Sequence, residues 1–186
     1  MTLSIQPTQI NAQRQLFIRR ATAYFVDMTL LTIAIQATQW SLFALTDGFL
    51  SNRLGNNGWL IYGWILLTVS LPIWLYFVLF ERSQQRATPG KRLLGLQVVA
   101  DDNSQATLGQ LWSRTLLKLV PWEIFHLTFM LPIPIMNDPS AAFRPGFLIG
   151  FVVLVLYLLV LVRTPAQQSI HDLVAKTRVV QRDDVD

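Results

Sequence analysis

The sequence of 186 residues contains no cysteine, and this absence excludes disulfide frameworks, cysteine-ligated zinc, iron–sulfur clusters and thiol nucleophiles. Charge is also scarce, because only 14% of the residues are Asp, Glu, Lys or Arg, compared with about 25% in an average soluble domain. Hydrophobic residues make up 52% of the chain. This composition argues against a soluble protein, and we expect neither a cofactor nor a metal centre.

Four stretches are long and apolar enough to cross a membrane. Residues 59–80 contain no charged residue, and a helix needs about 20 apolar residues to cross the hydrocarbon core. Residues 21–45 and 146–162 are similarly apolar, with one carboxylate in the former. Residues 120–135 are less regular, because they contain two ionisable residues and three prolines, which remove backbone donors and bend helices. This last stretch either crosses the membrane or re-enters it.

The positive charges indicate an orientation. The chain carries 15 Lys and Arg residues against 11 Asp and Glu residues. If the N-terminus is cytoplasmic and all four stretches cross, 13 basic residues lie inside and only Arg53 and Arg144 lie outside, which is a strong positive-inside bias. Because the basic residues are dispersed between the spans, nucleic-acid binding is not indicated. We expect a multi-pass protein of a bacterial inner or thylakoid-like membrane, with both termini in the cytoplasm.

Shorter segments are expected beside the membrane on the cytoplasmic side. Residues 107–119 place Leu and Trp side chains on one side of a helix, which is typical of a helix in the membrane interface. Residues 94–100 and 177–181 are rich in β-branched residues and are predicted to pair as strands. The predicted fold is an all-α membrane protein of about four transmembrane helices, with an interfacial amphipathic helix and a small cytoplasmic β-pairing. Its expected divisions are a polar N-terminal tail (1–16), a membrane domain (17–180) and an acidic C-terminal tail (181–186).

Several motifs resemble those of a known family. Residues 20–27 (RATAYFVD), 87–99 (ATPGKRLLGLQVV) and 168–180 (QSIHDLVAKTRVV), together with Arg114, are similar to motifs of the RDD family of small multi-span membrane proteins. The resemblance covers nearly the whole chain, from about residue 17 to residue 180. The charged residues that it assigns to the family motifs include Lys91, Arg114, His171 and Asp172.

The family takes its name from an arginine and two aspartates, which the resemblance assigns to Arg20, Asp27 and Asp172 of this sequence. Gln167 stands where family members often have an arginine, directly before the glutamine of the C-terminal motif. The resemblance implies a membrane protein, with cation and proton transport attributed to some members and association with other membrane machinery to others.

Asp27 is the acidic residue inside the first expected span. Steps of three and four residues place it on one helix face with Arg20, Tyr24 and Leu31, so it is expected to face protein. An ionised carboxylate at the centre of a membrane helix costs about 3 kcal/mol and often marks an ion or proton pathway. Asp27 is therefore a candidate cation and proton site, with Arg20 and Tyr24 beside it. The alternative is a structural ion pair that locks the first helix to Arg114 or to the C-terminal segment.

Glu123 and His126 are three residues apart and share a helix face. The Glu-x-x-His pattern also occurs in metal sites of helical bundles, but one copy without further ligands is weak evidence for a metal. We interpret the two residues as hydrated or paired with each other. They are also candidates for ion or proton binding together with Asp27, because histidine titrates near neutral pH.

His171 and Asp172 follow Ser169 in an arrangement that caps helix N-termini. Asp172 is therefore predicted to cap a short helix, and an aspartate in that position can also pair with Arg92 or Arg114. No nucleophile motif accompanies His171. We therefore expect a protein that is not an enzyme.

Two classes of function remain for such a chain. A transporter subunit would bind a cation and a proton alternately, and because four helices are few for alternating access, it would act as a homo-oligomer. An accessory, scaffold or assembly factor would use its buried charges only for structure and present its surfaces to a larger membrane complex. We favour transport, because an intramembrane acid is by default a functional-site hypothesis. The expected partners are the lipid bilayer, a cation and a proton in the first case, and a larger membrane complex in the second.

Overall fold

The computed structural model describes residues 7–46, 53–138 and 143–182. These residues form helices, one π-helical turn (η1), one 3-10 turn (η2) and two strands. In chain order they are α1 (Pro7–Leu45), α3 (Gly58–Ile65), η1 (Leu66–Ser70), α4 (Leu71–Arg82), α5 (Pro89–Leu93), β1 (Leu96–Ala100), α6 (Leu108–Met130), η2 (Ile135–Asn137), α7 (Pro145–Arg163), α8 (Ile170–Ala175) and β2 (Thr177–Gln181).

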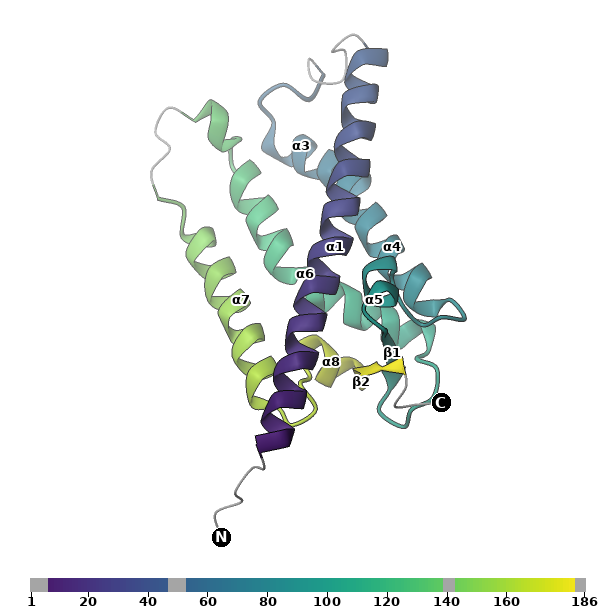
Figure 1. The fold of residues 1–186 in the computed structure, drawn as a ribbon. Coiled ribbons are helices and arrows are strands. Elements are labelled where there is room, and N and C mark those ends of the chain that lie inside the picture. The colour runs from purple at the N-terminus through teal and green to yellow at the C-terminus, as the bar shows by residue number, and fades with distance from the viewer. Residues whose placement is uncertain (1–6, 47–52, 139–142, 183–186) are drawn as a thin grey trace.

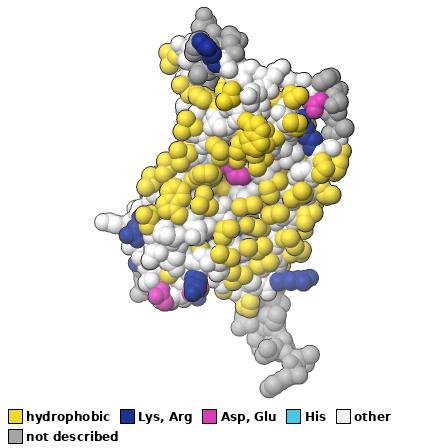
Figure 2. All heavy atoms as spheres, turned by 180° about the vertical axis from the view of Figure 1, so that it is seen from behind, with side chains coloured by type: hydrophobic (Ala, Val, Ile, Leu, Met, Phe, Trp, Pro, Cys, Tyr) yellow, Lys and Arg dark blue, Asp and Glu magenta, His cyan; other side chains and the backbone are white. Residues whose placement is uncertain are grey.

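Four helical segments are long and apolar enough to cross a membrane: Gln13–Leu45, Gly58–Arg82, Leu108–Asn137 and Pro145–Arg163. The start of α1, the short helices α5 and α8 and the two strands lie at one end of the bundle, which we call the sheet end (Figure 1). Figure 2 shows the molecule from behind the view of Figure 1, and hydrophobic side chains cover much of this face between the two ends of the bundle. The expected fold class is confirmed: a mostly helical multi-pass membrane protein with a small sheet.

The sheet joins two segments that are far apart in the sequence. β1 and β2 are antiparallel, with Val98 opposite Val179 and Ala100 opposite Thr177, so the predicted strand pairing is confirmed. The first strand begins at Leu96, two residues later than the predicted start. Its buried side chains pack in one cluster with Ala23 of α1 and with residues of α4 and α6. The sheet is thereby anchored on the helical bundle.

Two boundaries differ from the predicted ones. α1 begins at Pro7, so most of the stretch expected as a polar tail is part of the first helix. The expected interfacial helix at 107–119 and the expected span at 120–135, as far as Met130, form one continuous helix, α6, which starts with a capping box between Thr107 and Gln110. Residues 131–134 are not helical, and the 3-10 turn η2 follows them.

α6 continues through Pro121, which lacks the N–H that would bond to the Leu117 carbonyl. The hydroxyl of Tyr157, from α7, donates to that carbonyl oxygen at 2.8 Å. A backbone group in a membrane must find its partner within the protein. Tyr157 therefore supplies the hydrogen bond that the proline removes.

α7 approaches α6 closely at two glycines spaced four residues apart. A Cβ atom on Gly150 would lie 2.7 Å from the Phe125 ring, and one on Gly146 would lie 2.1 Å from the Thr128 hydroxyl oxygen. Small residues at this spacing let membrane helices pack backbone against backbone. The contact positions α7 and, through it, the C-terminal segment that follows.

Candidate functional site

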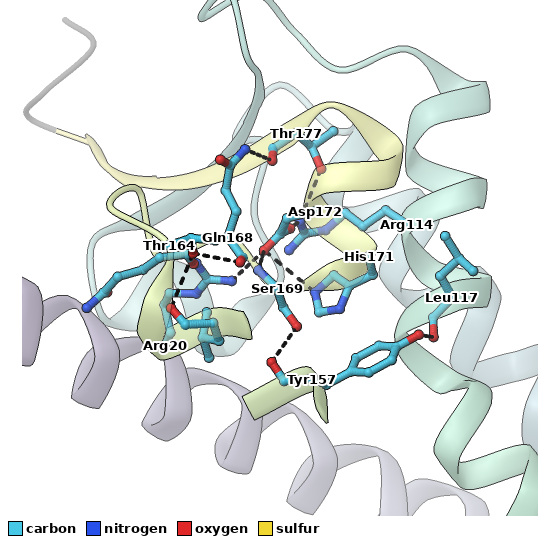
Figure 3. A network of polar contacts seen from close by, with 12 residues as sticks. Arg20, Arg114, Leu117, Tyr157, Thr164, Gln168, Ser169, His171, Asp172 and Thr177 are labelled. Carbon is cyan, nitrogen blue, oxygen red and sulfur yellow. Dashed lines mark hydrogen bonds and ion pairs between the residues drawn. The ribbon is translucent and has the colours of Figure 1, made fainter. Parts of the chain in front are cut away.

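Five charged side chains at the sheet end form one connected group, which we call the charge network. Asp172 of α8 accepts from Arg20 of α1 at 2.7 Å and is paired with Arg114 of α6 (Figure 3). Glu81 of α4 is paired with Arg114 at 3.2 Å and with Lys91 of α5. The network therefore links five helices through alternating positive and negative groups.

The charge network lies inside the protein. Asp172, Glu81 and Arg114 are each at most 2% exposed. Desolvation of such ions is expensive, and removing one partner of a buried pair typically costs about 3–5 kcal/mol because the other charge remains without compensation. Burial lowers the pKa of Lys91, with Glu81 opposing and Arg114 adding to that shift. The contacts of the charge network are those of a structural lock, that is, a set of buried ion pairs that holds the helices α1, α4, α5, α6 and α8 together.

Asp27 does not belong to this network. It is fully buried and accepts three hydrogen bonds, from the Tyr76 hydroxyl at 2.7 Å, the Thr88 hydroxyl at 2.5 Å and the Gly90 backbone N–H at 2.8 Å. Across residues 7–46, 53–138 and 143–182 it forms no ion pair. The hypothesis of an Asp27 ion pair is therefore wrong, because neutral donors surround its carboxylate.

The close approach at Gly90 explains why a glycine stands in this motif. A Cβ atom there would lie 2.3 Å from the Ala23 carbonyl oxygen and 2.9 Å from the Asp27 carboxylate. No other residue fits between α1 and α5 without moving one of them. Asp27 and Gly90 together attach the first helix to the segment that precedes β1.

Arg20, rather than Asp27, forms the ion pair between the first helix and the C-terminal segment. It donates to the Gln167 carbonyl oxygen and to Asp172, and so joins the first helix to the C-terminal segment. The side-chain amide of Gln167 donates to the Gln13 carbonyl. The basic contact to Asp172 therefore comes from α1 and α6.

His171 and Asp172 lie where the capping prediction placed them. Asp172 accepts from the Ser169 backbone N–H at 3.2 Å, so it caps α8 as predicted, and it also pairs with Arg114. The His171 ring lies beside Tyr157, with 5.8 Å between ring centroids. Burial lowers the pKa of His171 well below its ordinary value, and the surrounding cations, led by Arg114, act in the same direction.

Two residues of this region were not found from the sequence. Glu81 follows directly after the uncharged stretch and gave no pattern of its own, although the basic residues expected near it needed an acidic partner. The ammonium group of Lys118 lies 3.1 Å from the ring centroid of Phe77 and 5.1 Å from that of Tyr24. The hydroxyl of Tyr24 accepts from the Trp122 indole at 2.9 Å.

Glu123 and His126 lie in a different place, at a cavity of about 240 Å³ between α1, the η1–α4 segment and α6, which we call the membrane cavity. Glu123 accepts from the Tyr62 hydroxyl at 3.3 Å, and His126 Nδ1 lies 3.7 Å from its carboxylate. The Glu123 side chain is 19% exposed. The polar side chains of the lining are Thr32, Gln36, Ser70, Glu123 and His126.

The structure thus separates the candidate residues into two groups. Arg20, Lys91, Arg114 and Asp172 hold the sheet end together, and Asp27 fixes α5 to α1. Glu123 and His126 line a cavity within the membrane-crossing part. In the described part of the chain, no group of three or more His, Asp or Glu side chains is arranged to hold a metal ion.

Four helices long and apolar enough to cross a membrane, with a C-terminal segment fastened to the first and third of them by buried ion pairs, fit a small multi-pass membrane protein. The chain belongs to the RDD family, whose model matches residues 15–176. This range contains both the charge network and the membrane cavity. No curated protein and no solved structure matches the chain.

Proposed function

We propose that this protein is a cation- and proton-handling subunit of a membrane transport system, in which Glu123 is the exchanging carboxylate. The observation that carries the proposal is the contrast between two acids. Asp27 is fully buried and held by three donors at 2.5–2.8 Å. Glu123 is partly exposed, has longer contacts of 3.3 Å to Tyr62 and 3.7 Å to His126, and lines a cavity. A carboxylate with longer contacts and a cavity beside it is the better candidate for binding a ligand reversibly.

The position of Glu123 supports the same role. It follows Arg114 by nine residues on α6, which is about 13 Å along the helix axis, so it lies deeper in the membrane than the charge network. Ionisable groups at such depth usually mark ion or proton pathways. In the proposed cycle Glu123 binds either a proton or a cation, and His126, 3.7 Å away, gives or receives the proton. Four helices are few for alternating access, so we propose that the subunit works as a homo-oligomer.

The test is ion flux in proteoliposomes that contain a pH-sensitive dye. We expect the wild type to move protons when a gradient of Na⁺, K⁺ or an organic ammonium ion is imposed, and Glu123→Gln to abolish this movement. Asp27→Asn should retain the proton flux of the wild type when the flux is divided by the amount of folded protein. Asp102→Asn, on the exposed turn after β1, serves as the matched control. A wild type that moves no protons under any of these gradients contradicts the proposal.

A second candidate is a non-enzymatic accessory or assembly factor of a larger membrane complex. It is favoured by the fact that Arg20, Lys91, Arg114 and Asp172 are all engaged in contacts within the protein, so the family motifs serve to fix its shape. Purification in mild detergent, followed by mass determination and identification of co-purifying proteins, distinguishes the two candidates. A stoichiometric partner without ion flux would favour the accessory role.

A further inference from the structure

We propose that the membrane cavity binds a small organic ammonium compound that has an apolar body and a hydrogen-bond acceptor. This inference rests on the proposed function, because it names the class of cation that Glu123 would bind. It is based on the size of the cavity, its charge, its apolar walls and the unpartnered indole N–H of Trp74.

The size of the cavity favours an organic ligand. Its volume of about 240 Å³ equals that of roughly eight water molecules, each of which occupies about 30 Å³ in the liquid. A dehydrated inorganic cation is far smaller and is held by several oxygen ligands in direct contact. Glu123 contributes the only carboxylate of the lining. The space is therefore better matched to a molecule of about ten non-hydrogen atoms than to a bare ion.

The charge and the walls of the cavity favour an ammonium group on an apolar body. None of the lining residues is Lys or Arg, so Glu123 gives the cavity a negative charge that a cation would balance. Most of the lining is apolar, and it includes the indoles of Trp74 and Trp122. Indole faces attract ammonium groups, and ligand pockets commonly combine apolar walls with a few polar groups.

A buried polar group without a partner points to a ligand in the same space. The indole N–H of Trp74 is buried and forms no hydrogen bond with any described residue. Ser70 is 1% exposed, and its hydroxyl lies beside Glu123. Unsatisfied buried groups are rare and need an explanation. A ligand acceptor would complete the hydrogen bonding of the Trp74 N–H.

Ser70 ends the π-helical turn η1. Such turns are rare and are frequently found at functional sites. Because the π-turn is part of the span that forms one wall of the cavity, the irregular helix and the unpartnered Trp74 N–H occur in the same wall. These are two independent features that favour a binding site.

The test uses two radiolabelled probes, 2-phenylethylammonium and its hydroxyl-bearing relative 2-amino-1-phenylethanol, with the full-length protein in nanodiscs. We expect saturable binding of both after subtraction of empty nanodiscs. The hydroxyl-bearing probe should bind more tightly, because its oxygen can accept from Trp74. An excess of NaCl or KCl should displace neither probe from the cavity.

Variants and a neutral competitor separate this site from non-specific partition into lipid. Glu123→Gln should weaken both probes by about tenfold or more, since it removes the counter-charge. Trp74→Phe should remove the preference for the hydroxyl-bearing probe while retaining most of the binding of the other. Asp102→Asn should change neither. In the wild type, neutral 2-phenylethanol should compete poorly, and this measurement does not depend on the folding of any variant.

The outcomes distinguish this inference from the proposed function. Equal binding to wild type and Glu123→Gln, or equal competition by 2-phenylethanol, overturns the organic-ammonium site. If Glu123-dependent proton movement with Na⁺ or K⁺ is still observed in that case, the proposed function stands without the organic-ammonium site. Saturable, Glu123-dependent binding of the probes without any flux supports the site and contradicts transport.

Discussion

At the scale of single residues, Asp27 and Glu123 illustrate how the environment of a membrane carboxylate sets its role. Three donors from α4, the turn before α5 and the backbone of α5 occupy both oxygens of Asp27. Glu123 has longer contacts, 3.3 Å to the Tyr62 hydroxyl and 3.7 Å to His126, and lines a cavity. A buried carboxylate with short hydrogen bonds to both oxygens is costly to separate from its donors, whereas one with longer contacts beside a cavity can exchange a partner for a ligand.

Asp27→Asn is expected to leave the protein folded but less stable. The amide oxygen can still accept from Tyr76 and Gly90, and the Thr88 hydroxyl can rotate to accept from the new NH₂ group. The variant then loses only the additional strength that a negative charge gives these hydrogen bonds. We expect this loss to reduce the free energy of unfolding by about 1–2 kcal/mol. Denaturant unfolding in detergent micelles measures this, with Asp102→Asn as the exposed control. An unchanged stability together with loss of ion flux would instead make Asp27 the exchanging group.

His171 is expected to make stability depend on pH between about 6.5 and 5. Its pKa in the folded protein lies well below the ordinary 6.5, so the unfolded chain binds a proton in this range and the folded protein does not. Stability is therefore fully present above about pH 6.5 and falls as the pH decreases below that value. The measurement is the apparent Tm as a function of pH.

His126, the other histidine of the chain, provides the matched control for His171. We expect His171→Gln to flatten the decrease in Tm between about pH 6.5 and 5, whereas His126→Gln should retain it. The opposite result, a flattening only in His126→Gln, would assign the acid sensitivity to the membrane cavity.

At the scale of elements, α6 depends on its neighbour α7. Tyr157→Phe removes the hydroxyl that donates to the Leu117 carbonyl and leaves that oxygen without a partner in a membrane-crossing helix. We expect a loss of about 1–3 kcal/mol in the free energy of unfolding. Thermal unfolding of the purified protein tests this loss.

A double-mutant cycle with Pro121→Ala tests the reason for that loss. Alanine restores the N–H that can bond to Leu117, so the additional change Tyr157→Phe should cost less in the Pro121→Ala background than in the wild type. Strictly additive effects would show that Tyr157 contributes through packing alone.

Most elements were predictable because their signals are local. Long apolar stretches indicated the four helices that are able to cross a membrane, and the β-branched residues around Val98 and Val179 indicated the strand pair. The continuity of residues 107–119 with the following span was not predicted, because Pro121 is compensated by a tyrosine 36 residues later in the sequence, which no local pattern reveals. Glu81 was overlooked for the same reason, since Lys91 and Arg114 reach it from other elements.

At the scale of the whole molecule, the charge network connects the first helix with the C-terminal segment through Arg20. We expect Arg20→Gln to lower the free energy of unfolding by about 3 kcal/mol, because it removes one partner of a buried ion pair. The adjacent Arg19→Gln should have little effect, since Arg19 is exposed and its side chain bonds to the amide oxygen of Gln181 rather than to a charged group. Limited proteolysis should cut the segment between α7 and α8 faster in Arg20→Gln than in the wild type or Arg19→Gln. Equal cleavage of the two variants would contradict the role of Arg20 in holding the C-terminal segment.

The fold also fixes which segments must share a side of the membrane. The start of α1, the turn after β1 and the strand β2 lie at the sheet end (Figure 1), and the positive-inside distribution predicts that this end is cytoplasmic. Since the chain has no cysteine, single introduced cysteines can be labelled without background. Ser104→Cys, exposed after β1, should react with an impermeant maleimide only after permeabilisation of cells. Asn52→Cys, outside the described residues, should react in intact cells, and labelling of Ser104→Cys in intact cells would reverse the orientation.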